Sequence, residues 1–281
     1  MMGNLVVKGS VAMVISILIF ANSVMAFNPH SRHDFFNRNS EKKAERMVEH
    51  LSDELDLDSV QVSTLNQIKE ELTAKQKELK VDRQQIFETM IAEIAKEKFD
   101  VSKFQVMVDN HAAKTKLETA FFAKKLIEFH QMLSPVQRET AVEKVKEMKQ
   151  RREDRKNGWF YKTPEERADS IVNMISNRLD LSETQFADFT KIKNNFLKSR
   201  AKYFGDGYFL RLSDQFSEQF VRDTLNKDEI QHEMNEGISR MEKLMNVVLT
   251  NLEKAHHTLN NEQRAQIVEQ MQKRQGRFSR K

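Results

Sequence analysis

The sequence predicts an all-α protein made of two tandem four-helix units with long antiparallel helices. Three observations predict this fold: few turn residues, helical stripes of apolar residues, and an internal repeat. Seven Gly and three Pro stand among 281 residues, far below the roughly 12% of an average chain, whereas sandwiches and barrels use both at frequent turns. The lack of Gly-rich loops and of any Cys excludes dinucleotide fingerprints, disulfides, thiol nucleophiles and cysteine metal sites.

Residues 1–26 have the features of a secretory signal peptide. Lys8 precedes an apolar run over residues 11–20, and small residues stand at the −3 and −1 positions before a cleavage site after Ala26. We therefore expect export to the periplasm, with no stable membrane insertion after cleavage. The alternative is an uncleaved anchor, for which the apolar run is short. Residues 27–40 are expected to form a flexible tail.

The chain contains two copies of one unit. The sequence LDLDSVQ at 55–61 recurs as LDLSETQ at 179–185, and LSPVQ at 133–137 corresponds to LNNEQ at 259–263. The offset is 124 in the first pair and 126 in the second, so the second copy has two extra residues, which we place at 205–207. We expect a first unit over 41–156, a linker over 157–163, a second unit over 164–275 and a basic tail over 276–281.

Each copy reads as four helices. From Ile230 to Leu259 apolar residues recur every three or four positions, which is a helical period, and a weaker stripe runs from Phe104 to Leu133. The expected helices of the first copy span 41–54, 59–97, 102–132 and 135–153. Those of the second copy span 164–178, 183–222 (interrupted at 205–207), 228–257 and 261–275.

A short motif occurs four times, as Leu, a polar residue, two further residues and Gln. The polar residue is Asp58, Ser134, Ser182 or Asn260, all preferred helix N-caps. Gln three positions later can return a hydrogen bond to the N-cap amide, which closes a capping box. The motif therefore predicts four helix starts, and by itself it carries no chemistry.

This motif, twice per four-helix unit behind a signal peptide, resembles the LTxxQ signature of the Spy/CpxP family of periplasmic proteins. Capping residues replace Thr here, and residues 94–100 look like the family's stretch between its second and third helices. The resemblance implies an ATP-independent chaperone that holds unfolded or partly folded periplasmic proteins, called clients below. Because the usual member has one unit and dimerises as a shallow cradle, two units in one chain imply a monomeric, covalent pseudo-dimer.

The resemblance also implies client-binding residues. A Leu pair before the second helix and a Met in its later part match Leu55, Leu57 and Met90 in copy one, and Leu179, Leu181 and Phe216 in copy two. Adaptable or exposed apolar side chains suit such binding, and ordinary core packing is the alternative for each residue. Four rings flank Gly205 and Gly207 and cannot all face one side, so we expect some to be exposed as a client patch: Tyr203, Phe204, Tyr208 and Phe209.

The alternative function is a metal-binding or envelope-stress regulator that acts on a sensor kinase. Without Cys, a metal site would use His and carboxylates, and His30 with His33 in the tail is the first candidate. No catalytic set is visible, so we expect neither an enzyme nor a cofactor. Acidic and basic residues are interspersed at a formal net charge of +4, so we expect no nucleic-acid binding.

Overall fold

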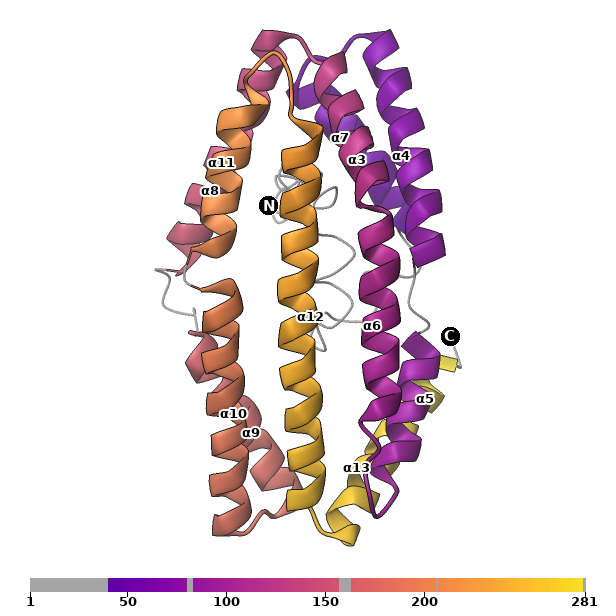
Figure 1. Cartoon of the computed structure of the whole chain (residues 1–281), viewed down its shortest axis with the longest axis vertical. Coiled ribbons are helices and arrows are strands. Elements are labelled where there is room, and N and C mark those ends of the chain that lie inside the picture. The colour runs from indigo at the N-terminus through magenta and orange to yellow at the C-terminus, as the bar shows by residue number, and fades with distance from the viewer. Residues whose placement is uncertain (1–39, 80–82, 157–162, 206, 280–281) are drawn as a thin grey trace, which may run out of the picture. The chain divides into compact units, whose positions relative to one another are not determined.

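The computed structural model describes residues 40–79, 83–156, 163–205 and 207–279 (Figure 1). Within these residues every regular element is an α-helix, which confirms the all-α prediction. The expected signal peptide, the N-terminal tail up to residue 39 and almost all of the linker lie outside them. Among the described helices, none is long and apolar enough to cross a membrane.

The described residues of the first copy form six helices. The expected helix over 102–132 is divided by a turn at Glu118, which separates α6 from α7, and the described parts of the expected helix over 59–97 are α4 and α5, on either side of residues 80–82. At this turn the Glu118 amide bonds to Thr115 O, and the Thr119 hydroxyl bonds to Lys116 O at 2.8 Å. Such side-chain bonds compete with the helical ladder. The helices are α3 (Ser40–Glu54), α4 (Ser59–Leu79), α5 (Arg83–Ile94), α6 (Ser102–Leu117), α7 (Thr119–Met132) and α8 (Pro135–Lys156).

The described residues of the second copy form five helices, and its long second helix is interrupted where the glycines predict. Gly207 has φ of +89°, which suits glycine, and a Cβ on Gly205 would lie 2.9 Å from Ala201 O. Gly205 is therefore favoured because there is no space for a side chain, and Gly207 because of its backbone conformation. The helices are α9 (Pro164–Leu179), α10 (Glu183–Phe204), α11 (Tyr208–Phe220), α12 (Lys227–Thr258) and α13 (Asn261–Ser279).

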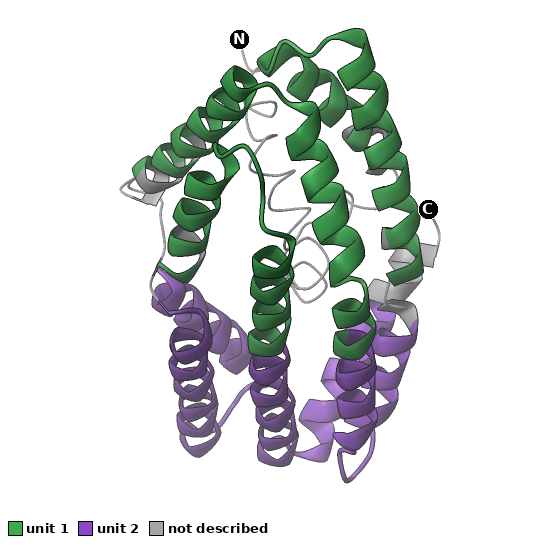
Figure 2. Cartoon of the chain, turned by 45° about the horizontal axis from the view of Figure 1, so that its top comes forward, with its two compact units in different colours: residues 1–80, 112–159, 207–241 green, residues 81–111, 160–206, 242–281 purple. Residues whose placement is uncertain are grey.

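The chain folds into two compact units, and neither is a single sequence copy (Figure 2). Among the described residues, unit 1 holds α3, α4, the end of α6, α7 and α8 of copy one together with α11 and the start of α12 from copy two. Unit 2 holds α9, α10, α13 and the rest of α12, together with α5 and the start of α6 from copy one. The compact units thus differ from the expected sequence units, because the hairpin between the second and third helices of each copy packs with the other copy.

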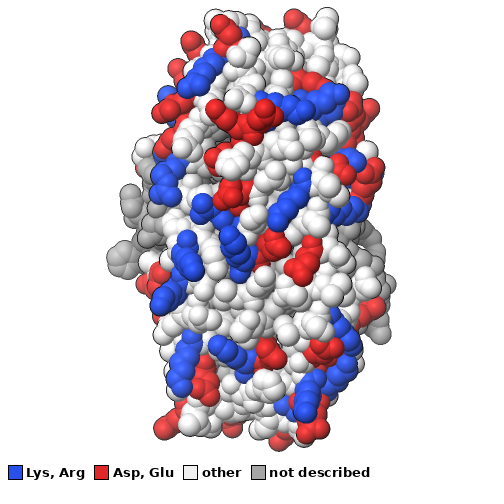
Figure 3. Space-filling view, in the orientation of Figure 1, with Lys and Arg blue, Asp and Glu red and all other residues white. Residues whose placement is uncertain are grey.

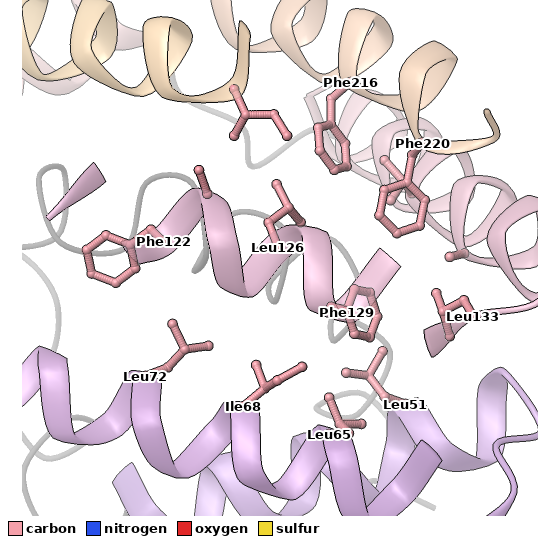
Figure 4. Close-up of a cluster of buried hydrophobic side chains, with 14 of the residues drawn as sticks. Leu51, Leu65, Ile68, Leu72, Phe122, Leu126, Phe129, Leu133, Phe216 and Phe220 are labelled. Carbon is pink, nitrogen blue, oxygen red and sulfur yellow. The ribbon is translucent and has the colours of Figure 1, made fainter. Parts of the chain in front are cut away.

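Unit 1 has an extensive hydrophobic core, in which side chains of α3, α4 and α7 meet the two phenylalanines of α11 (Figure 4). Phe129 and Phe220 are fully buried, and their ring centroids are 6.1 Å apart. Removing a buried phenylalanine ring typically costs about 3–5 kcal/mol of unfolding free energy. The folding of unit 1 therefore depends on both copies.

Unit 2 has a smaller cluster of the same kind. Four buried side chains form it, and four half-buried ones pack against them. Apart from this cluster, the copy-one ring Phe99 lies against His256 of α12 at 5.4 Å between centroids. The buried members are Val172, Leu179, Phe189 and Leu259, and the half-buried ones are Ile175, Leu181, Ala255 and Ile267.

Candidate functional site

The four capping boxes are confirmed, and the fold joins them in pairs. In unit 1 the side-chain amides of Gln61 and Gln137 face each other, and each Nε2 donates to the other's Oε1 at 2.8 and 3.0 Å. Each Oε1 also accepts the N-cap amide of its own box, from Asp58 at 3.0 Å and from Ser134 at 2.8 Å. The first turns of α4 and α8 are thereby tied together.

Each glutamine also caps the end of a helix that precedes the other box. Gln61 Nε2 donates to Met132 O at 2.6 Å, and Gln137 Nε2 donates to Leu55 O at 3.1 Å. Both amide hydrogens and the carbonyl oxygen of each side chain are therefore in use. A buried helix end needs such partners for its last carbonyls, so one pair of glutamines satisfies four helix ends.

Unit 2 repeats this arrangement with the residues of copy two. Gln185 and Gln263 exchange the same two amide bonds at 2.7 and 3.0 Å. Gln185 Nε2 donates to Thr258 O, and Gln263 Nε2 donates to Leu179 O. Every partner lies 124 or 126 residues after its counterpart, so the internal repeat extends to individual hydrogen bonds.

The turns before the first box of each copy are equally tight. Asp56 and Asp180 both have φ of +49°, and the amides of Leu57 and Leu181 bond back to Ser52 O and Ser176 O. This is the Schellman ending of a helix. Each of these leucines thus ends one helix and precedes the N-cap of the next.

Large apolar side chains are exposed beside the boxes. Val60 and Val136, the second helical residues after their N-caps, are 73% and 71% exposed in unit 1. Phe186 follows Gln185 in unit 2 and is 39% exposed. Sequence reasoning missed the valines as binding candidates. The available signal was their place between an N-cap and its Gln, a position that faces away from the box and the core.

The leucines that were expected to bind clients lie beneath these surfaces. Leu55 and Leu179 are buried in the two cores, and Leu57 and Leu181 are half-buried against the same cores. The expectation of an open leucine surface is corrected on this point for Leu55 and Leu179. Their side chains must fill the space where two helix ends meet, so they pack inward.

Met90 and Phe216 each lie in the compact unit that consists mainly of the other sequence copy. Phe216 belongs to the core of unit 1 with Leu55, although it comes from copy two. It is buried, so it is a core residue and not an open contact. Met90 of copy one is half-buried on α5 in unit 2, which also holds Leu179 and Leu181.

The three described rings around the glycine break do not form the expected exposed patch. Phe204 is buried in unit 2, and Tyr203 beside it is half-buried with Lys202 Nζ at 5.4 Å from its ring centre. Tyr208 belongs to unit 1, half-buried, with the Arg240 guanidinium at 4.9 Å from its ring. The side chain of Phe209 lies outside the described part of the chain. The break places Tyr203 and Phe204 in unit 2 and Tyr208 in unit 1, so the three rings do not gather on one surface.

Two buried histidines bind the hairpin of the other copy. His130 Nε2 lies 2.9 Å from Arg222 O and 3.1 Å from Phe220 O, and His256 Nε2 lies 3.0 Å from Lys96 O. Because carbonyls only accept, each Nε2 must carry the hydrogen. Among the described residues neither Nδ1 has a hydrogen-bond partner. Burial lowers the pKa of both rings, since a second proton on Nδ1 would be poorly solvated.

The arginine after the second box of each copy is buried next to these histidines. The Arg138 guanidinium donates to Arg222 O and lies 3.3 Å from His130 Nε2. Arg264 donates to Leu259 O at 2.7 Å and to the Asn261 side chain. Both cations therefore satisfy backbone carbonyls near helix ends, and Arg138 also lies 3.6 Å from the Asp223 carboxylate.

No set of described residues forms a metal site. No group of three or more His, Asp or Glu side chains in the described part of the chain could hold a metal ion, and the candidates His30 and His33 lie outside it.

Comparisons with protein-family models, curated proteins and solved structures find no match to this chain.

Proposed function

We propose that this protein is an ATP-independent chaperone that holds clients, as the resemblance to the Spy/CpxP family implies. The observation that carries the proposal is the pair of exposed valines, Val60 and Val136, beside the helix ends locked by Gln61 and Gln137. Exposed apolar groups on a rigid support are typical of interaction surfaces. Dense, interspersed charges of both signs cover the face shown in Figure 3.

The proposed mechanism is passive. Charged side chains attract unfolded segments through long-range fields, and the exposed apolar groups then remove part of the client's apolar surface from water. Full burial of one valine is worth about 1.5–3 kcal/mol, so two valines and Phe186 supply only weak, reversible binding. Weak contacts allow a client to leave or fold without an energy source.

The two copies supply a substitution that the fold already accepts. Thr184 occupies the position of Val60 in copy two, and Glu262 occupies that of Val136. The variant Val60→Thr with Val136→Glu therefore removes the exposed apolar pair without changing the capping boxes. The reverse variant, Thr184→Val with Glu262→Val, adds an apolar pair to unit 2.

The test is the aggregation of denatured malate dehydrogenase diluted into buffer without ATP, followed by light scattering. We expect wild-type protein at equimolar amount to suppress scattering, the variant without valines to suppress it less, and the reverse variant to suppress it at least as well as wild type. Unchanged thermal unfolding of both variants shows that the fold is kept. Scattering that wild-type protein leaves unchanged would remove the proposal.

A further inference from the structure

A second exposed surface lies on α9 of unit 2. Arg167, Ile171, Met174 and Arg178 are spaced by four, three and four residues, so they share one face of this helix. Ile171 is 36% and Met174 is 39% exposed, and both arginines are exposed. We call these four residues the α9 stripe. Its order is basic, apolar, apolar, basic.

The equivalent face in unit 1 is engaged within the protein. Met47 stands at the position of Ile171 and packs against the core of unit 1. Glu54 stands at the position of Arg178, and it pairs with Lys144 of α8 at 2.9 Å and with His50 at 3.9 Å. In copy two the counterpart of Lys144 is Gln270, so that ion pair has no equivalent. Two positions of this helix face are thus used for packing and for an ion pair in unit 1, whereas their counterparts Ile171 and Arg178 are exposed in unit 2.

We infer that the α9 stripe binds a short protein segment that carries two apolar residues between two acidic ones. Arginine binds carboxylates through two parallel hydrogen bonds, and methionine adapts to varied apolar shapes. Eleven residues of helix separate the two arginines by about 16 Å. A helical segment would match with acidic residues eleven positions apart, and an extended one with about five.

The charges of α9 favour a protein segment over an anionic membrane. Outside the stripe the helix carries Glu165, Glu166 and Asp169, so the helix as a whole is not basic. An anionic membrane surface interacts with all charges within a Debye length of about 8–10 Å, so it would be repelled by these carboxylates. A bound segment contacts only the side of the helix that holds the two arginines.

This inference deepens the proposed chaperone function and rests on it, since it names the client segments that unit 2 selects.

The probe is a fluorescein-labelled 16-residue peptide with Glu, Leu, Leu and Glu at positions i, i+4, i+7 and i+11. A second peptide has Lys in place of both Glu. Binding is measured by fluorescence anisotropy with the full chain.

We expect the acidic peptide to bind wild-type protein and the lysine peptide to bind at least tenfold more weakly. Arg178→Glu should weaken binding of the acidic peptide about tenfold, and Met174→Asp should weaken it similarly. Leu117→Asp is the matched control, because Leu117 is 82% exposed in unit 1 and lies outside the stripe. Its variant should bind as wild type does. Thermal unfolding of each variant checks the fold.

Equal binding of the acidic peptide to wild type and to Arg178→Glu overturns the inference, and so does the absence of binding. Phosphatidylglycerol vesicles form a separate arm: binding to vesicles that Arg178→Glu abolishes, with no binding of the peptide, assigns the stripe to a membrane instead. If aggregation is suppressed but the peptide does not bind, the chaperone proposal stands without the stripe. If the peptide binds but aggregation is not suppressed, the stripe stands as a binding surface and the chaperone proposal fails.

Discussion

His130 of the first copy donates a hydrogen bond from Nε2 to the backbone carbonyl of Arg222 in the second copy, at 2.9 Å. His256 makes the reciprocal bond to Lys96 of the first copy at 3.0 Å. The donors differ by 126 positions, and so do the acceptors. These bonds join each hairpin to the helices of the other copy within one compact unit, so neither unit consists of one copy alone.

The buried histidines make stability depend on pH. Because burial lowers their pKa values, the unfolded chain takes up protons near pH 6.5 while the folded protein resists them. The free energy of unfolding should therefore fall as pH drops below about 6.5, by at most about 1.4 kcal/mol per pH unit for each histidine. Urea denaturation at pH 7.5, 6.5 and 5.5 measures this.

The control for this pH dependence is the double variant His130→Gln with His256→Gln, which keeps an N–H donor but cannot titrate. Arg138 and Asp223 face His130, and Arg264 and His257 face His256, so these groups stay in place. A double variant that loses as much stability as wild type between pH 7.5 and 5.5 would show that other groups cause the effect.

The paired glutamines should not tolerate a carboxylate. In Gln61→Glu one oxygen would face Met132 O and Gln137 Oε1, because Gln61 Nε2 now donates to both. We expect a loss of about 2 kcal/mol in unfolding free energy at pH 7, with partial recovery below pH 5, where the new carboxyl can donate. Urea denaturation measures it, with the exposed Gln272→Glu as control. A loss no larger than that of the control would argue against the amide pair.

Glu93 should support the fold in mild acid. Although burial alone would raise its pKa, hydrogen bonds from Lys103 and Lys96, both at 2.6 Å, hold the pKa at about 2. The folded protein therefore resists protonation that the unfolded chain accepts near pH 4.3, and stability should fall from about pH 4.5 toward 2. Gln219 is the counterpart of Glu93 in copy two, so Glu93→Gln is a compatible variant. It should flatten this part of the acid-unfolding curve, and an unaltered curve would contradict the assignment.

The strained turn at Asp180 offers a stabilising change. With φ of +49° its Cβ is unfavourable by about 1–2 kcal/mol, and glycine removes this strain. We expect Asp180→Gly to raise the melting temperature by a few degrees, and Asp56→Gly to act similarly. Asp188→Gly, inside α10, should instead lower it. Calorimetry that finds Asp180→Gly destabilising would show that the aspartate side chain holds the turn.

Local spacing predicts local structure well in this chain. The four capping boxes and the break at Gly205 and Gly207 follow from neighbouring residues alone, and all are present. The pairing of Gln61 with Gln137 could not be predicted, because it depends on two helix ends 76 residues apart. The packing of each hairpin with the other copy could not be predicted for a related reason. A sequence repeat predicts that equivalent contacts form in both copies, but it does not say which copy supplies each partner.

The proposed binding residues are harder to predict from the sequence than the fold. Leu55 and Val60 are both apolar and five positions apart, yet one is buried and the other is 73% exposed. What separates them is the turn at Asp56, which directs Leu55 inward and leaves the second residue after the N-cap at the surface. The exposure of Ile171 likewise depends on whether another helix covers α9, which no local pattern records.

Photo-cross-linking tests the proposed chaperone function most directly. A benzophenone side chain is placed in turn at the positions of Val60 and Val136, and at those of their counterparts Thr184 and Glu262, and the protein is irradiated with denatured malate dehydrogenase. We expect cross-links to the client from the two valine positions and few from their counterparts. Equal cross-linking from all four positions, or none from the valine positions, would contradict the proposal that clients are held at the exposed valines.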